Sequence, residues 1–323
     1  MVKKIYIDGY HGTAGLEIDD LLSPRNDLEV LKLSKSTRSS SIEERIELMK
    51  GSDATILCLP NVASKEIMSK VKNDDDLNDK PLIDTSSQFR LDSGWTYGLP
   101  ELSETARKEI AESKRVANVG CHASAFILAI KPLIDAEFIR KQCIVTAASQ
   151  TGYSGGGKEM IEKYEALNSK NCSEGIGVEL YNLQSNHKHL EEMRLRSGLE
   201  KSPIFMPAVG NYYRGLCLSV GFHRSQIVPK CSIHDKCFEI LKSHYSNSSL
   251  VKVNNSFSEN SLRAERLSAN LNARRNFADI FVSGSSDTVQ VTLAMDNLRK
   301  GAATTAVQNL NLMLGISEYR GLL

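Results

Sequence analysis

The sequence has almost no net charge, no long hydrophobic run and no closely paired cysteines. Its 40 lysines and arginines balance 39 aspartates and glutamates, which leaves a net charge of +1 and excludes the basic signature of a nucleic-acid-binding protein. Its longest apolar runs, at 54–59 and 125–130, are far shorter than the roughly 18 residues that a membrane span needs. The N-terminal segment passes directly into a glycine turn, without the apolar stretch of a signal peptide. These features predict a cytoplasmic protein that binds neither nucleic acid nor membrane.

The seven cysteines are irregularly spaced, and none belongs to a CxxC pair. An odd and irregular set argues against both a disulfide framework and a structural zinc site. We therefore expect reduced thiols, most of them buried, and no bound metal.

The order of apolar runs and helical patterns divides the 323 residues into two predicted domains. Short strand-like runs alternate with helical patterns as far as residue 119, which is typical of βαβ units and a parallel sheet. After an apolar helix over 123–133, longer strand candidates with irregular spacing indicate an α+β domain. The fold prediction is α/β. A Rossmann-type, doubly wound dinucleotide-binding domain spans 1–120 and is completed by a C-terminal helix over 300–323. An α+β catalytic and dimerisation domain on a mixed or antiparallel sheet spans 121–299.

A glycine-rich turn directly follows the first predicted strand and opens the first predicted helix. It contains Gly9, Gly12, Thr13 and Gly15. Glycines in this position allow a close approach to a pyrophosphate, and the helix N-terminus supplies unpaired N–H groups. The GxxGxxG spacing is a looser signal than GxGxxG, so an ordinary strand-to-helix turn is the alternative. The surrounding βαβ pattern favours cofactor binding.

The segment after the second predicted strand favours NADP(H) over NAD(H). It carries Ser36 and Arg38 and no acidic residue before Glu43, whereas an NAD site usually places an acid there to bind the ribose 2′-hydroxyl. Hydroxyl groups with a guanidinium suit a 2′-phosphate. A solvated surface loop is the alternative interpretation.

Cys121 lies where a predicted strand turns into a helix. A thiol at a helix N-terminus has a lowered pKa and a larger thiolate fraction. Gly120 before it and small residues after it favour a reactive cysteine over a buried packing residue. We expect the side chain of His122, next in sequence, to point elsewhere on the turn.

Two histidines, His187 and His189, are candidates for the base that assists this thiol. Their spacing does not choose between them, and no nearby residues complete a metal-ligand set. A second glycine cluster at 152–157 precedes Lys158. It is either a flexible surface loop or a backbone surface for substrate or nicotinamide, with Lys158 as a nearby cation.

Taken in order, these segments resemble the N-acetyl-γ-glutamyl-phosphate reductases, and the shorter subtype most closely. This family is related to aspartate-semialdehyde dehydrogenase. The matching motifs run along nearly the whole chain: KIYIDGYHGTAGLEI, ILCLPNVAS, IDTSSQFRL, YGLPEL, NVGCHAS, TGYSGGGK, the HKH run and DNLRKGAATTAVQNLNLMLG.

The resemblance implies a role for individual residues. Cys121 is the implied nucleophile and His187 the implied acid/base, because it follows Tyr181 by six residues as in the family pattern. The implied cofactor-binding residues are Ser154, Gly155 and Asn297. The implied substrate-binding residues are Arg90, Asn118 and Lys158. A homodimer or homotetramer is also implied.

The implied chemistry is reductive dephosphorylation of an acyl phosphate. The Cys121 thiolate displaces phosphate to give a thioester, hydride from NADPH reduces it, and the aldehyde leaves. Related acyl phosphates of aspartate or aminoadipate are alternative substrates, and an NADP-binding regulator without catalysis is an alternative function. The chain departs from the family at Val119, at 122–124, where the family has Tyr-Pro-Thr, and at Glu191, where it has proline.

Overall fold

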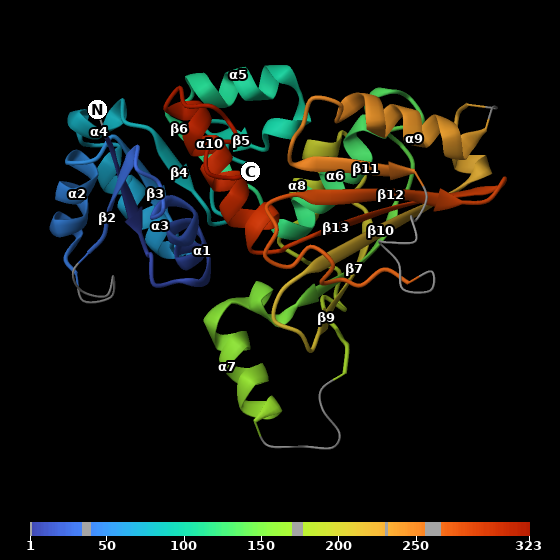
Figure 1. Ribbon diagram of the computed structural model, residues 1–323, viewed down its shortest axis with the longest axis horizontal. Helices are drawn as coiled ribbons and strands as arrows, with labels where there is room; N and C mark the ends of the chain where they lie inside the picture. The colour runs from blue at the N-terminus through green and yellow to red at the C-terminus, as the bar shows by residue number, and fades with distance from the viewer. Residues whose placement is uncertain (1, 34–39, 170–176, 230–231, 256–265) are drawn as a thin grey trace. The chain divides into compact units, whose positions relative to one another are not determined.

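A computed structural model describes residues 2–33, 40–169, 177–229, 232–255 and 266–323. The chain divides into two compact units, each considered by itself (Figure 1). Residues 1–119 and 302–323 form the parallel-sheet unit, and residues 120–301 form the mixed-sheet unit.

The parallel-sheet unit is built on six strands in the order β2-β1-β3-β4-β6-β5, and every neighbouring pair is parallel. The strands are β1 (Lys3–Asp8), β2 (Leu28–Leu31), β3 (Ala54–Leu57), β4 (Leu82–Asp84), β5 (Thr96–Gly98) and β6 (Arg115–Asn118). The sequence order reverses at β1 and β3, the type of switch point at which doubly wound sheets bind ligands.

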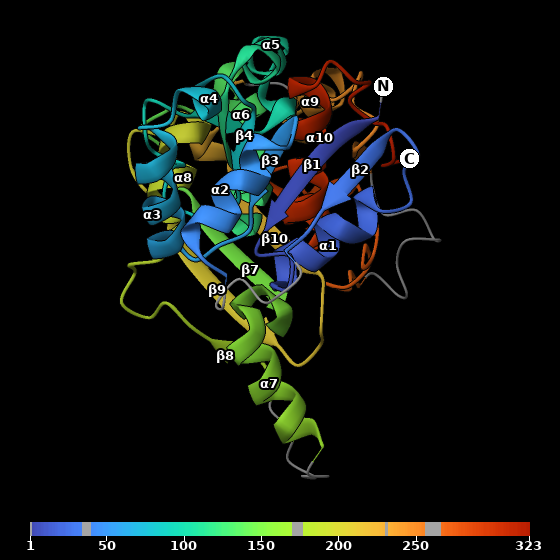
Figure 2. The same ribbon diagram turned by 90° about the vertical axis from the view of Figure 1, so that its left-hand side faces the viewer.

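Helices cover both faces of this sheet, so its central strands are buried on both sides (Figure 2). Tyr6 and Leu57 belong to a core with side chains of α2, α3 and α4. Helix α10 contacts β4, β5 and β6 and also packs against α1 and α5. The helices are α1 (Thr13–Leu22), α2 (Ile42–Lys50), α3 (Asn61–Val71), α4 (Asp75–Asn78), α5 (Glu104–Glu112) and α10 (Thr304–Met313).

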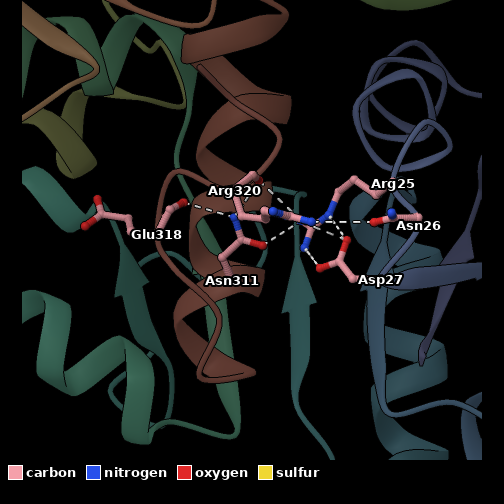
Figure 3. Close-up of polar contacts among 6 residues, drawn as sticks. All are labelled: Arg25, Asn26, Asp27, Asn311, Glu318 and Arg320. Atoms are coloured by element: carbon pink, nitrogen blue, oxygen red, sulfur yellow. Dashed lines mark hydrogen bonds and ion pairs between the residues drawn. The ribbon is translucent and has the colours of Figure 1, made fainter. Parts of the chain in front are cut away.

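The C-terminal segment is held to this unit by a polar network around Arg25 (Figure 3). The Arg25 guanidinium donates to Asp27 through Nε and Nη2, and its Nη1 donates to Oδ1 of Asn311 in α10 at 2.7 Å. The Asn311 amide in turn donates to the carbonyls of Glu318 and Arg320. Residues from the two ends of the sequence therefore stabilise one domain-like unit.

The mixed-sheet unit has seven strands in the order β11-β12-β13-β10-β7-β9-β8. Pairs β11–β12 and β7–β9 are parallel and the other pairs are antiparallel. The strands are β7 (Thr146–Gly152), β8 (Glu179–Leu180), β9 (Ile204–Gly210), β10 (Leu216–His223), β11 (Val251–Asn255), β12 (Ala278–Gly284) and β13 (Thr288–Met295). The parallel sheet with flanking helices and the mixed sheet confirm the predicted fold class.

Helix α6 (Cys121–Asp135) contacts β10 and β13 and packs beside α8 (Leu190–Ser197) and α9 (Ile233–His244). It continues past Pro132, which cannot donate to the carbonyl of Leu128. The hydroxyl of Tyr245 donates to that carbonyl at 2.6 Å. This bond satisfies the carbonyl that Pro132 leaves without its helical partner.

Several elements were not predicted. Helix α7 (Gly157–Asn168) begins within the glycine cluster, which was interpreted either as a surface loop or as a backbone surface for substrate or nicotinamide. There, Gly157 adopts φ +76°, which a glycine tolerates without strain. Strand β12, which pairs with β13 along its whole length, was not predicted. In the described part of the chain, no helix combines the length and apolar character needed to cross a membrane.

Candidate active site

The glycine turn occupies the connection from β1 to α1, as predicted. Gly9 has φ +82°, and a Cβ there would lie 2.4 Å from the carbonyl oxygen of Cys58. A Cβ on Gly15 would lie 2.6 Å from the carbonyl oxygen of Gly9. Only glycine fits these two close approaches.

Helix α1 begins at Thr13 with no side-chain cap on Gly12 and no acidic residue in its first turn. The N–H groups of that turn and the positive end of the helix dipole therefore meet no competing carboxylate from the helix itself. Such a terminus suits a pyrophosphate. Ser36 and Arg38, the predicted 2′-phosphate ligands, lie outside the described residues.

Cys121 is the first residue of α6, and its side chain is half-buried. The N-cap residue, Gly120, makes no side-chain hydrogen bond to the helix start, and the first helical turn contains no acidic residue. Instead, the Gly120 N–H donates to Oε1 of Glu192 at 3.0 Å, and Glu192 is buried at 1% exposure. This bond fixes the backbone that carries the thiol. Glu192 had no predicted role, because its neighbour in space is 72 residues away in sequence.

A cluster of aromatic rings includes His122, the residue that follows Cys121 in sequence. The centroid of the His187 ring is 4.8 Å from that of His189, 5.7 Å from that of His122 and 5.2 Å from that of Phe205. The His122 ring therefore belongs to this cluster. Its direction relative to the Cys121 thiol stays a prediction. Burial raises the pKa of Tyr181, and the charge of a Cys121 thiolate acts in the same direction.

His187 is held in one tautomer. Its Nδ1 accepts the backbone N–H of His189 at 3.1 Å, so the proton of the neutral ring is on Nε2. Burial, with a smaller contribution from the charge of Lys188, lowers the pKa of His187 to about 4. At neutral pH the ring is an uncharged hydrogen-bond donor through Nε2.

A π-helical turn, Arg299–Ala303, brings the backbone against the thiol. A Cβ on Gly301 would lie 2.8 Å from Cβ of Cys121 and 3.3 Å from the carbonyl oxygen of Asp296. The buried Asp296 carboxylate accepts the backbone N–H groups of Leu298 and Arg299 and holds the start of this turn. π-Helical turns of this kind are frequent at functional sites.

Three predicted cofactor residues come together in the mixed-sheet unit. The Asn297 amide donates to the Ser154 hydroxyl at 3.0 Å, and its carbonyl accepts the N–H of Gly215 at 2.8 Å. Gly155 lies beside the same amide, since a Cβ there would be 3.5 Å from Nδ2 of Asn297.

The predicted substrate residues have other partners. Arg90 donates from Nε to the Asn118 carbonyl at 2.8 Å and from Nη2 to the Thr85 carbonyl. The Asn118 amide donates to the Ala302 carbonyl and accepts from Asn309. Lys158 is 84% exposed on the first turn of α7 and pairs with Glu162. These contacts bind Asn118 into the parallel-sheet unit and leave Lys158 in solvent.

Comparisons with known proteins identify the family of the chain. The family description "Semialdehyde dehydrogenase, NAD binding domain" matches residues 4–112, and "Semialdehyde dehydrogenase, dimerisation domain" matches residues 121–297. The chain belongs to the semialdehyde dehydrogenase family. It is 37% identical, over 98% of its length and the full length of each relative, to the N-acetyl-gamma-glutamyl-phosphate reductases of Brucella ovis and Brucella abortus. The predicted resemblance is confirmed.

Solved structures of family members share the fold. The chain matches aspartate semialdehyde dehydrogenase II of Vibrio cholerae with a TM-score of 0.72 and 14% identity, over 98% of this chain and 99% of that one. It matches the aspartate semialdehyde dehydrogenase of Francisella tularensis with a TM-score of 0.71 and 16% identity, over 95% and 99%. At these identities the likeness concerns the fold alone.

Proposed function

We propose that the protein reduces N-acetyl-γ-glutamyl phosphate with NADPH. The products are N-acetyl-L-glutamate 5-semialdehyde and phosphate, formed through a thioester on Cys121, in a step of arginine biosynthesis. One observation carries the proposal: a half-buried thiol at an uncapped helix start, followed in sequence by His122, whose ring centroid is 5.7 Å from that of the neutral His187. The reductases that share 37% of its residues support the choice of substrate.

The parallel-sheet unit fits a dinucleotide. The two positions that admit only glycine and the uncapped first turn of α1 would hold the pyrophosphate through Gly9, Gly12, Thr13 and Gly15. Arg38 and Ser36 would take the 2′-phosphate. When bound, NADPH supplies the hydride that an acyl group needs to become an aldehyde.

Cys121 would act as the nucleophile. Its thiolate forms a C–S bond to the acyl carbon, and the bond from that carbon to the phosphate oxygen breaks, so phosphate leaves with the electron pair. The backbone N–H of Cys121, at the positive end of the α6 dipole, is the proposed donor to the developing oxyanion.

His187, the predicted acid/base, would act on the oxygen of the acyl group. Its Nε2–H can hydrogen bond to that oxygen as negative charge develops there and would stabilise the oxyanion of the hemithioacetal formed on Cys121. The C–S bond of this oxyanion then breaks, so the aldehyde leaves, the thiolate is regenerated and the histidine keeps its proton. Arg90 is the proposed cation for the substrate's anionic groups, whereas Asn118 and Lys158 are assigned no substrate contact.

We further propose that two copies associate through the uncovered face of the mixed sheet. Ile204 and Met206 in β9 are 53% and 49% exposed, and their partners Thr146 and Ala148 in β7 are also exposed. An exposed apolar row on a sheet face is typical of an interaction surface. Dissociation of a Met206→Glu variant, measured by light scattering, would support this interface, and an unchanged mass would exclude it.

A cytoplasmic location is proposed as well. The described cysteines at 58, 121, 143, 217 and 237 form no disulfide, as expected in a reducing compartment.

The decisive assay compares three semialdehydes, those of N-acetylglutamate, aspartate and aminoadipate, in phosphate-dependent NADP⁺ reduction. We expect turnover with the first and its loss in Cys121→Ser, while NADPH binding persists. A preference for another semialdehyde would overturn the substrate assignment. NADPH binding without turnover of any of the three would favour a regulator.

A further inference from the structure

The segment from Tyr181 to His187 reverses its direction. Six residues of extended chain would span about 20 Å, yet the ring centroids of Tyr181 and His187 are only 5.8 Å apart. The reversal brings the His187 ring to that of His122, with centroids 5.7 Å apart and ring planes at 87°. The turn between Tyr181 and His187 therefore determines where the proposed acid/base lies.

Tyr181, at the start of the turn, is fixed in place. Its hydroxyl is 2.9 Å from Nε2 of His122, whose Nδ1 is 2.9 Å from the Ser149 hydroxyl of β7. The His122 ring is 3% exposed in the first turn of α6. The Tyr181 N–H donates to the Pro207 carbonyl of β9 at 3.2 Å. The start of the turn is thus tied to a buried ring and to the mixed sheet.

His187, at the end of the turn, is tied to the start of α8. Its carbonyl accepts the N–H of Leu190 at 3.0 Å, and its Nδ1 accepts the N–H of His189 at 3.1 Å. Phe205 of β9 packs against the ring, with centroids 5.2 Å apart. These contacts orient the ring, whereas the reversal of the chain is made by residues 182–186.

Two residues with positive φ make the reversal, Asn182 at +59° and Ser185 at +53°. Asparagine is one of the few residues other than glycine that adopt such a conformation readily. The Asn182 carbonyl accepts the N–H of Ser185 at 2.9 Å, and Oδ1 of Asn182 accepts the N–H of Asn186 at 2.9 Å. Residues 183–186 are exposed, so these bonds, rather than burial, hold the shape of the turn.

Serine lacks the preference of asparagine for positive φ. Non-glycine residues in this conformation are strained, and they cluster at active sites and ligand-binding segments. We propose that Asn182 and Ser185 are positioning residues, because the left-handed turn that they form places the His187 ring against His122. The inference rests on the proposed function only in taking His187 as the acid/base.

The test follows the His187 ring without substrate. Histidines labelled with ¹³C at Cε1 are titrated by NMR from pH 8 to pH 5, and the His187 signal is assigned by its absence in His187→Asn. Burial, with a smaller contribution from the charge of Lys188, lowers the pKa of His187 to about 4. The wild-type signal should therefore hardly move in this range. The other titratable groups around the ring are His122, His189 and Tyr181.

Asn182→Ala removes both the side-chain bond and the preference for positive φ. We expect the turn to open and the His187 ring to gain solvent, so that its pKa rises by at least about one unit towards 6.5. Asn182→Gly keeps the freedom of the backbone and loses only the bond. Its shift should be in the same direction and smaller.

Ser185→Val tests the backbone conformation. A β-branched residue does not adopt positive φ readily, so this variant should also raise the pKa of His187. Ser185→Gly, which adopts positive φ without strain, should leave the signal unmoved. Glu137→Val is the matched control, because Glu137 is exposed, has the same φ of +53° and lies just beyond the C-terminal end of α6. It should lose comparable stability without moving the His187 signal.

Kinetics add a second readout. Asn182→Ala and Ser185→Val should lower kcat by about tenfold and leave KM nearly unchanged, because misplacement of a reacting group slows the chemical step. Glu137→Val should keep the wild-type kcat.

An unmoved His187 signal in folded Asn182→Ala and Ser185→Val would overturn the proposal. So would an equal shift in Glu137→Val, or a wild-type His187 that titrates near pH 6.5. Should neither variant fold, Asn182→Gly decides, and an unmoved signal there would overturn the proposal. A wild-type protein that turns over no acyl phosphate would refute the proposed function, whereas the NMR titration would still decide the role of the turn.

Discussion

Gly301→Ala is predicted to disable the nucleophile while leaving the fold in place. The added Cβ would lie 2.8 Å from Cβ of Cys121, whereas carbon atoms pack at about 3.5–4.0 Å. Cβ of Cys121 cannot rotate away, because it is bonded directly to the backbone. To remove the clash between the two Cβ atoms, the π-helical turn or the start of α6 must therefore shift by nearly an ångström. Overpacking of this kind costs about 1–3 kcal/mol.

A shift of about 1 Å at a reacting atom can lower the rate roughly a hundredfold. We expect kcat of Gly301→Ala to fall by about ten- to a hundredfold. At roughly 2–4 °C per kcal/mol, the melting temperature should fall by several degrees. Gly221→Ala is the matched control, because no atom lies within 4 Å of its Cβ position in β10. Wild-type kcat in Gly301→Ala would show that the turn does not support the thiol.

Three further outcomes are expected. Arg38→Ala should weaken NADPH binding far more than NADH binding in fluorescence titrations, and equal losses would exclude a 2′-phosphate contact. His187→Asn should abolish turnover and His189→Asn should not; loss in His189→Asn alone would transfer the role to His189. The acid limb of the kcat/KM profile should lie near pH 4, where His187 gains a proton. The pKa of His122 is about 3 in the folded protein and 6.5 when the ring is exposed. Between these pH values the unfolded chain binds the proton more readily than the folded protein does. The free energy of unfolding therefore falls as the pH drops through this range. His122→Gln should reduce the difference in urea midpoint between pH 4.5 and pH 7.5, and an unchanged difference would contradict burial of a neutral ring.

Local sequence signals predicted much of the fold. Each strand of the parallel sheet except β5 coincides with an apolar run, and the glycine turn lies where strand and helix patterns meet. Helix α7 was missed because the glycines before it signal a loop, whereas Gly157 only turns the chain into the helix.

The parts of the site that depend on distant residues were not predictable. Cys121 could be selected from its neighbours, but Ser149, Tyr181 and Glu192 reach the same place from 28, 60 and 71 residues along the chain. Their convergence depends on the pairing of β7 in the mixed sheet and on the packing of α8 beside α6. No periodicity in the sequence records such contacts.

The most direct test of the central claim is a pre-steady-state mixture of enzyme, NADP⁺ and N-acetylglutamate semialdehyde without phosphate. A thioester mechanism predicts a burst of up to about one NADPH per thiol, with an N-acetylglutamyl group on the Cys121 peptide that added phosphate removes. Phosphate-dependent turnover with neither a burst nor an acylated Cys121 would contradict the account.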